Sequence, residues 1–188
     1  MTRSEKQLIR QAKKFDREAL AEIYDQYSDA LFNYAVRRVG SPQQAEDFVA
    51  ETFERFLNAL ERGGGPEDHL QAYLYRITHN LITDLYRREP PPPLQLEEDR
   101  IQGSEKGPGQ VFTERSQAER IRQALHLLTP GQQQVIILKY LQGLSNQEVA
   151  RAMDKSVGSI KAQAHRGLAA LERILVSDEG ENLPETRE

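Results

Sequence analysis

Residues 144–168, LSNQEVARAMDKSVGSIKAQAHRGL, have the pattern of two short helices joined by a tight connection. Ser145 and Glu148 form a capping box, in which each side chain accepts a hydrogen bond from the other residue's backbone N–H, so a helix is predicted to begin here. The apolar pattern of this helix stops at Asp154, and Ser156 can cap a second helix. The residues predicted to be buried along the second helix, which recur at spacings of three and four, are Val157, Ile160, Ala164 and Leu168.

The opposite face of the second predicted helix is polar and basic. It has no acidic residue between Lys155 and Ala170. A helix in the major groove of DNA needs short residues for close approach, cations for phosphates and guanine edges, and amides for adenine. The pattern predicts a helix-turn-helix, although an ordinary amphipathic hairpin with a solvated basic face fits the same segment. The predicted DNA-facing residues are Ser159, Lys161, Ala162, Gln163, His165 and Arg166.

Charge is distributed unevenly along the 188 residues, whose net charge is −4. Residues 117–175 carry eight Lys and Arg side chains against four Asp and Glu side chains, and acidic stretches flank them on both sides. Residues 117–175 are therefore a basic segment within a chain of negative net charge, and such a segment is typical of proteins that contact nucleic acid.

Several classes of protein are excluded by what the chain lacks. It has no cysteine and only four scattered histidines, so we expect no disulfide, no metal and no cofactor. No apolar run approaches the length that crosses a bilayer, and the N-terminus lacks the apolar segment of a signal peptide, so we expect a cytoplasmic protein without membrane insertion. No paired carboxylates, nucleophile and base, or Gly-rich phosphate loop indicate an enzyme.

The periodicity predicts an all-α fold of two small helical domains. Residues 1–88 form the N-terminal domain, and residues 89–113 form a flexible, acidic linker rich in Pro and Gly. Residues 114–175 form a C-terminal domain of four helices that contains the helix-turn-helix. Residues 176–188 are predicted to be an acidic, disordered tail.

Four helices are predicted in the N-terminal domain, over about 4–14, 16–39, 42–62 and 68–88. The second ends at Gly40, and Ser41 caps the third. The residues predicted to be buried in the second helix are Leu20, Ile23, Tyr24, Tyr27, Leu31, Ala35 and Val39. Those in the third are Ala45, Phe48, Val49, Thr52, Phe53, Phe56, Leu57 and Leu60.

Two helix faces in this domain are unusual. The third helix has an acidic face formed by Glu46, Asp47, Glu51 and Glu54, which is either a solvated surface or a binding surface. The fourth, LQAYLYRITHNLITDLYRR, is rich in tyrosine and arginine. Exposed bases of single-stranded nucleic acid stack on aromatic rings while cations follow the backbone. The sequence fits equally well an interpretation in which Tyr73 and Tyr75 only flank the core.

These motifs, taken together and in this order, resemble the extracytoplasmic-function sigma factors of bacterial RNA polymerase. AEDFVAETFERF (residues 45–56) is similar to the family's polymerase-binding motif, and LQAYLYRITHNLITDLYRR (residues 70–88) to its promoter-melting and −10 helix. Residues 128–168 resemble its −35-binding domain. The resemblance covers both domains and the linker between them.

The resemblance implies a function and the residues that carry it. The chain would bind core RNA polymerase and promoter DNA, and an anti-sigma protein would hold it inactive. Asp47, Glu51 and Phe53 would lie in the surface that binds the polymerase, and the −35 element would meet the basic face defined above. The residues expected at the −10 element, for binding and strand opening, are Tyr73, Tyr75, Arg76, His79, Asn80, Arg87 and Arg88.

A different class of protein could use the same helix-turn-helix. A stand-alone transcription regulator would combine it with an N-terminal sensing domain. That domain would need a ligand pocket or a dimer interface, and the fourth helix, with its tyrosines and arginines, would have no explanation.

Overall fold

The computed structural model describes residues 4–89 and 120–180. Every regular element in these two ranges is a helix, which confirms the all-α prediction. The predicted linker, from residue 90 onwards, lies outside the described residues. The chain divides into two compact units, one formed by residues 1–90 with 137–161 and the other by residues 91–136 with 162–188.

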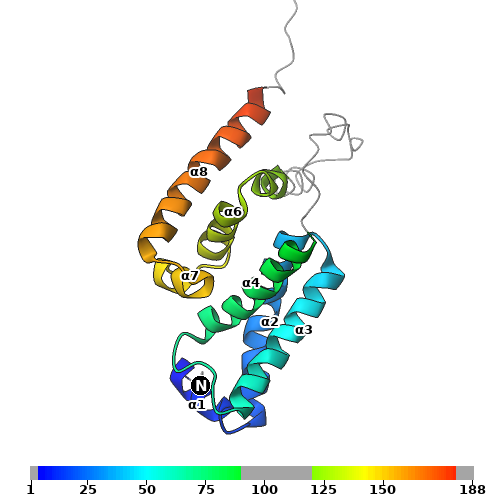
Figure 1. Ribbon diagram of the computed structural model, residues 1–188, viewed down its shortest axis with the longest axis vertical. Helices are drawn as coiled ribbons and strands as arrows, with labels where there is room; N and C mark the ends of the chain where they lie inside the picture. The colour runs from blue at the N-terminus through cyan, green and yellow to red at the C-terminus, as the bar shows by residue number, and fades with distance from the viewer. Residues whose placement is uncertain (1–3, 90–119, 181–188) are drawn as a thin grey trace, which may run out of the picture. The chain divides into compact units, whose positions relative to one another are not determined.

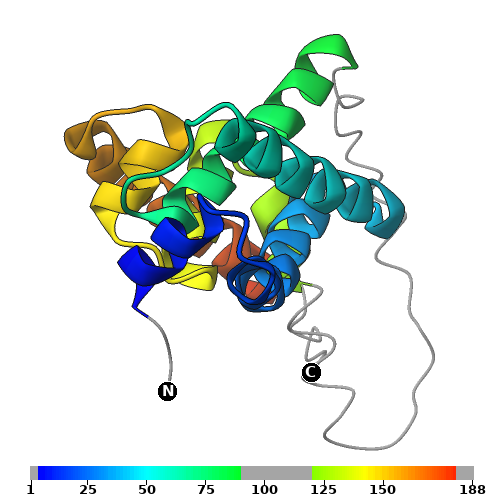
Figure 2. The ribbon, with the colours of Figure 1, turned by 90° about the horizontal axis from the view of Figure 1, so that it is seen from below.

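Helices α1 (Glu5–Ala12) and α2 (Arg17–Val39) begin the first unit and pack against one another (Figure 2). Asp16 caps α2, because its Oδ1 accepts a hydrogen bond from the backbone N–H of Ala19 at 2.9 Å. The helix ends at Gly40, whose φ of 73° lies in the left-handed region that glycine adopts without strain. The buried residues of α1 are Leu8, Ile9 and Ala12.

Helices α3 (Pro42–Glu61) and α4 (Leu70–Arg88) pack with α2 as a three-helix bundle (Figure 1). Ser41 caps α3 by accepting a hydrogen bond from the N–H of Gln44 at 3.3 Å. Between α3 and α4, two fully buried hydroxyls, those of Thr52 and Thr78, lie 2.9 Å apart. Most of the residues predicted to be buried along α3 are buried. Leu57 is exposed, so the prediction was wrong for this residue.

The first unit also contains η2 (Ile137–Leu141), a π-helical turn, and α7 (Asn146–Met153). The capping box is present: the Oγ of Ser145 accepts a hydrogen bond from the N–H of Glu148 at 3.2 Å, and the Glu148 carboxylate accepts one from the N–H of Ser145 at 2.8 Å. The helix ends at Asp154, whose φ is 53°. The predicted beginning and end of this helix are confirmed, whereas the π-helical turn was not predicted.

The second unit contains a helix over residues 120–126, α6 (Pro130–Ile136) and most of α8 (Val157–Gly180). Thr129 caps α6, because its Oγ1 accepts a hydrogen bond from the N–H of Gln132 at 3.4 Å. Helix α8 continues past Leu175 to Gly180, so the prediction of disorder from residue 176 is wrong for the start of that stretch.

The buried stripe of α8 differs in part from the predicted one. Ile160 and Ala164 are buried as expected, but Leu168 is 43% exposed and Val157 is exposed as well. Gly167 is buried instead, and a Cβ placed on it would lie only 3.0 Å from Cγ1 of Ile136. The close approach of α6 and α8 at this glycine therefore turns the next residue, Leu168, outward.

Candidate polymerase and nucleic-acid interfaces

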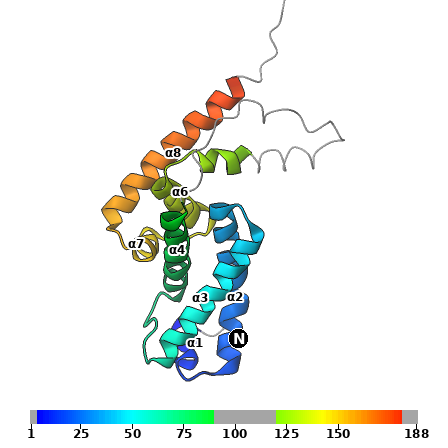
Figure 3. The same ribbon diagram turned by 45° about the vertical axis from the view of Figure 1, so that its right-hand side comes forward.

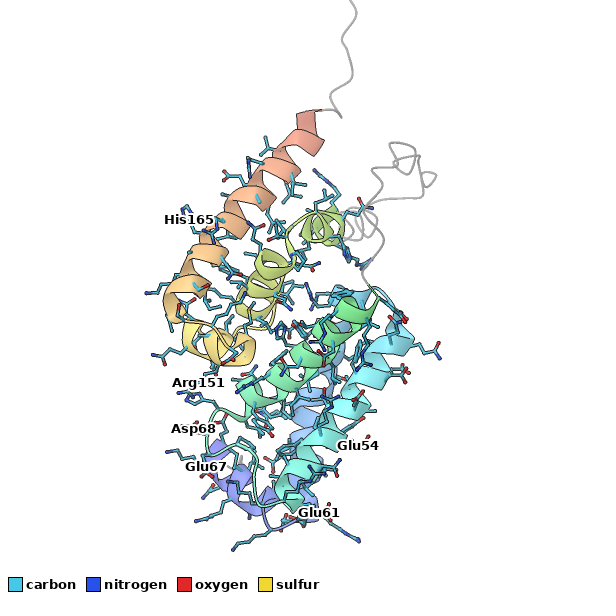
Figure 4. The ribbon with its side chains drawn as sticks, viewed as in Figure 1. Glu54, Glu61, Glu67, Asp68, Arg151 and His165 are labelled. Atoms are coloured by element: carbon cyan, nitrogen blue, oxygen red, sulfur yellow. The ribbon has the colours of Figure 1, made fainter. Side chains whose placement is uncertain are left out.

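The acidic face of α3 is exposed over much of the helix. Glu46, Asp47 and Glu54 are exposed, and none of them forms an ion pair with another residue that the structure describes. Glu51 forms an ion pair with Arg55 one turn later, at 2.6 Å. Figure 4 shows Glu54 and Glu61 along this helix. Unpaired carboxylates in one row leave a negative surface that can meet a positive one.

Phe53 does not lie in this surface. Its side chain is only 9% exposed, and its ring packs on the ring of Tyr24 with the centroids 4.8 Å apart. Tyr24, which the spacing of α2 placed in the core, is 50% exposed. The expectation that Phe53 lies at the surface was wrong because the ring of Tyr24 covers it, and Tyr24 is the aromatic group that reaches solvent here.

Helix α4 presents a cationic and polar surface. Arg76, Asn80 and Arg88 are exposed, as expected for residues that contact nucleic acid. Arg87 is exposed too and forms an ion pair with Asp84 at 3.2 Å. Surface ion pairs of this kind contribute little to stability and can exchange partners, so the guanidinium of Arg87 can still turn to a phosphate.

His79 is half-buried on the same helix. Its burial, followed by the nearby cations Arg38 and Lys155, lowers its pKa to about 4. The imidazole is therefore neutral at neutral pH and contributes no charge to DNA binding. It can take part only by hydrogen bonding or packing.

The two tyrosines of α4 differ. Tyr75 is fully buried, its ring meets that of Tyr34 edge to face at 5.4 Å, and its hydroxyl donates a hydrogen bond to Oε1 of Gln142 at 2.9 Å. The placement of Tyr75 at the DNA surface was therefore wrong. Its ring is covered by Tyr34 of α2, and its hydroxyl is bound by Gln142, which follows η2 in the same unit. Tyr73 is half-buried beside Phe56 at 6.2 Å, and burial raises its pKa.

A pocket of about 240 Å³ opens at the start of α4. His69, just before the helix, adopts a left-handed conformation with φ of 52°, and no side chain caps the helix there. The pocket was not predicted from the sequence, although the GGGP stretch at residues 63–66 marks a loop at this point. The pocket is lined by Pro66, Asp68, His69, Ala72, Tyr73 and Arg76, and by Arg151 of α7.

The basic face of α8 has the exposure that DNA contact requires. Ser156 caps the helix, its Oγ accepting a hydrogen bond from the N–H of Ser159 at 3.2 Å. Of the six residues predicted to face DNA, Lys161, Ala162, His165 and Arg166 are exposed, and Ser159 and Gln163 are partly exposed. The predicted face therefore lies outward as one patch, with Ile160 and Ala164 on the buried side.

The described ranges contain neither a metal-binding cluster nor a membrane-spanning helix. Within residues 4–89 and 120–180, no cluster of three or more His, Cys, Asp or Glu side chains could hold a metal ion. The same residues form no helix that is both long and apolar enough to span a bilayer.

Comparison with known families identifies both parts of the chain. Residues 23–90 match the family described as Sigma-70 region 2, and residues 118–171 match the family described as Sigma-70, region 4. Together with the two sets of helices and the acidic and basic faces, these matches define a two-region sigma factor. This is a class of transcription initiation factors and not a class of enzymes.

Two curated relatives resolve the family further. The chain is 30% identical over 182 residues to the ECF RNA polymerase sigma factor SigW of Bacillus subtilis, covering 90% of this chain and 96% of SigW. It is 32% identical over 177 residues to the ECF RNA polymerase sigma factor BldN of Streptomyces coelicolor, covering 92% of this chain but 66% of BldN. The chain belongs to the ECF RNA polymerase sigma factors, as the sequence motifs predicted.

Solved structures share the fold. CnrH in complex with the cytosolic domain of CnrY has a TM-score of 0.72 at 24% identity, covering 93% of this chain and 98% of that chain. The sigma factor RpoE in complex with the anti-sigma factor NepR, from Bartonella quintana, has a TM-score of 0.64 at 22% identity, covering 88% of this chain and 99% of that chain. The helical fold is thus shared at low sequence identity.

Proposed function

We propose that the chain binds core RNA polymerase, directs it to specific promoters and helps to open the −10 element. It would act in the cytoplasm and have no active site of its own, since the chemistry of transcription belongs to the polymerase. The observation that carries this proposal is the exposed acidic face of α3. In a regulator that only binds DNA such a face would be no more than a solvated surface, whereas a subunit of a larger enzyme needs a docking surface.

The polymerase-binding surface would be centred on Asp47 and Glu51. They are one turn apart on α3 and share the acidic face with Glu46 and Glu54. Phe53 would support this surface from below through its contact with Tyr24. Tyr24 would add an exposed ring at the edge.

The −10 surface would be formed by the exposed residues of α4. Arg76, Asn80 and Arg88 can contact phosphates and the edges of unstacked bases, and the partly exposed ring of Tyr73 can stack. Tyr75 would act from the core by holding the helix in place. His79 would stay neutral beside it.

The −35 surface would be the basic face of α8. Lys161, His165 and Arg166 are exposed along it, and the short side chain of Ala162 permits close approach to the groove. Family membership also supports an anti-sigma partner, which would cover the acidic face of α3, the basic face of α8, or both.

A double charge reversal on α3 tests the proposal. Asp47→Lys with Glu51→Lys turns attraction to a basic polymerase surface into repulsion worth several kcal/mol. Asp25→Lys with Asp29→Lys is the matched control, since these exposed residues have the same charge and the same spacing on α2. Both variants should remain folded by circular dichroism, because surface substitutions typically cost less than about 0.5 kcal/mol.

Co-elution with purified core polymerase separates the two variants. We expect the Asp47 and Glu51 variant to be lost from the polymerase peak and the control variant to remain with the wild type. A folded Asp47 and Glu51 variant that co-elutes and initiates transcription normally would refute the placement of the polymerase-binding surface on this face of α3.

A further inference from the structure

The C-terminal ends of α2 and α4 lie side by side in the three-helix bundle (Figure 3). The last four carbonyl groups of a helix have no partner within that helix beyond its cap, so the end of α2 requires donors from elsewhere. The N–H of Gly40 donates to the first of these four, the carbonyl of Val36. The hydroxyl of Tyr86, which lies 48 positions from Arg38 on α4, donates to the carbonyl oxygen of Arg38. Tyr86 therefore caps α2 from another helix.

The side chain of Arg38 makes a second contact with the same tyrosine. Its guanidinium lies over the ring of Tyr86, 5.5 Å from the centroid, and the residue is only 3% exposed. A buried cation needs compensating partners, and the negative face of an aromatic ring attracts a cation most strongly where water is excluded. Burial raises the pKa of the Tyr86 phenol, an effect that the nearby Arg38 opposes only in part, so the hydroxyl stays protonated at neutral pH and can donate. Arg38 thus binds both the hydroxyl and the ring of Tyr86.

This contact between Arg38 and Tyr86 anchors the last turn of α4, which also carries two exposed cations. Arg87 and Arg88 directly follow Tyr86, and the helix ends at Arg88. Successive residues of a helix are about 100° apart, so a turn that is held through Tyr86 directs the next two side chains away from α2. The last turn of a helix frays readily. Guanidinium groups on an anchored turn lose less conformational freedom when they bind phosphates than groups on a frayed one.

We propose that Arg38 and Tyr86 are positioning residues for promoter DNA: they hold the last turn of α4 so that Arg87 and Arg88 meet phosphates at the −10 element. Arg38 is buried and Tyr86 is half-buried, so both act through the two exposed arginines. The inference rests on the proposed function, because it concerns the same −10 surface. It adds to that surface two residues that its exposed face does not include.

Salt dependence distinguishes positioning from a purely structural role. Each contact between a cation and a phosphate steepens the fall of log affinity with log salt concentration by about 0.7–0.9. A chain with a loose last turn of α4 loses up to two such contacts, so its slope becomes shallower by about 1. A chain that is only less stable has a smaller folded fraction, which lowers the affinity by the same factor at every salt concentration and leaves the slope unchanged.

The experiment uses the full-length chain bound to core polymerase, and its probe is a promoter fragment isolated by in vitro selection with the wild type. Tyr86→Phe removes the hydroxyl and keeps the ring beside Arg38. Thr52→Val is the matched control, because it also removes a hydroxyl that forms a hydrogen bond between two helices of the bundle. Arg87→Gln with Arg88→Gln, alone and combined with Tyr86→Phe, completes a double-mutant cycle.

We expect Tyr86→Phe to co-elute with core polymerase as the wild type does and to have a slope shallower by about 1. Its loss of affinity then grows about tenfold for each tenfold fall in salt concentration. Thr52→Val should keep the wild-type slope, and Tyr86→Phe should not alter the slope further once both arginines are replaced.

An unchanged slope in Tyr86→Phe, with or without a loss of affinity, would overturn the positioning role. An equal change of slope in the chain that already lacks both arginines would overturn it too, because Tyr86 would then not act through them. Failure of the wild type itself to co-elute with polymerase or to select any fragment would overturn the proposed function and this inference with it.

Discussion

The geometry of the buried hydroxyl pair between α3 and α4 predicts which of the two threonines is more costly to replace by valine. Thr78 Oγ1 donates to the carbonyl oxygen of Leu74 at 3.1 Å, so its single proton is already used. The hydrogen bond of 2.9 Å between the two hydroxyls must then be donated by Thr52. Thr52→Val therefore removes a donor and leaves Thr78 with its own bond, whereas Thr78→Val leaves a buried Thr52 proton without an acceptor.

The costs of these substitutions differ for that reason. Thr52→Val should lower the free energy of unfolding by about 1 kcal/mol, the usual net value of one hydrogen bond. Thr78→Val should cost about 2 kcal/mol, because desolvation of an unsatisfied donor is added. The double variant should be more stable than Thr78→Val alone, since two apolar groups of the same shape leave nothing unpaired.

Urea denaturation followed by circular dichroism measures all three variants. A cost for Thr52→Val equal to or larger than that for Thr78→Val would refute the assignment of the donor. Additive costs in the double variant would show that the two hydroxyls do not interact.

Three further predictions concern pH, capping and DNA recognition. The pKa of His79 falls from 6.5 to about 4 on folding, so between pH 4 and pH 6.5 the unfolded chain binds more protons than the folded chain. The contribution of His79 to stability is therefore complete above pH 6.5 and is lost as the pH falls toward 4. His79→Gln should therefore flatten the dependence of the urea midpoint on pH in this range. Ser145→Ala should lower the free energy of unfolding by about 1 kcal/mol through loss of the cap on α7, again measured in urea. At α8, Arg166→Ala should relax sequence preference at a cost of about 1–3 kcal/mol if Arg166 reads bases. Lys161→Ala should weaken binding to all sequences alike and reduce its salt dependence, and a binding selection at two salt concentrations would show both effects.

The ends of the helices were predictable because caps are local. The Ser145 and Glu148 box, the Ser41 cap and the Gly40 stop each depend on residues within four positions of one another, and all three are present. The exposed residues of α8 were predictable for a similar reason, since the buried Ile160 and Ala164 determine which residues lie on the opposite face. The π-helical turn at Ile137–Leu141 was not predictable, because its pattern of apolar residues also suits an α-helix.

Burial was less predictable where a helix has several neighbours. Helix α4 packs against α2, α3 and α7, so its buried arc extends past one stripe and includes Tyr75. Phe53 was assigned to the polymerase surface by its place in a motif, but Tyr24 from another helix covers it. Neither result depends on residues nearby in the chain.

The sequence by itself determined the family, the helical fold and the acidic and basic faces, because motifs, caps and periodicity are properties of short segments. Only the tertiary structure decided which aromatic side chains reach solvent and which residues meet at the pocket. Asp68 and Arg151 are 83 positions apart, and Tyr75 and Gln142 are 67 apart. Contacts at such separations depend on how whole helices pack, because that packing is fixed by the combined burial of many side chains and not by any one motif.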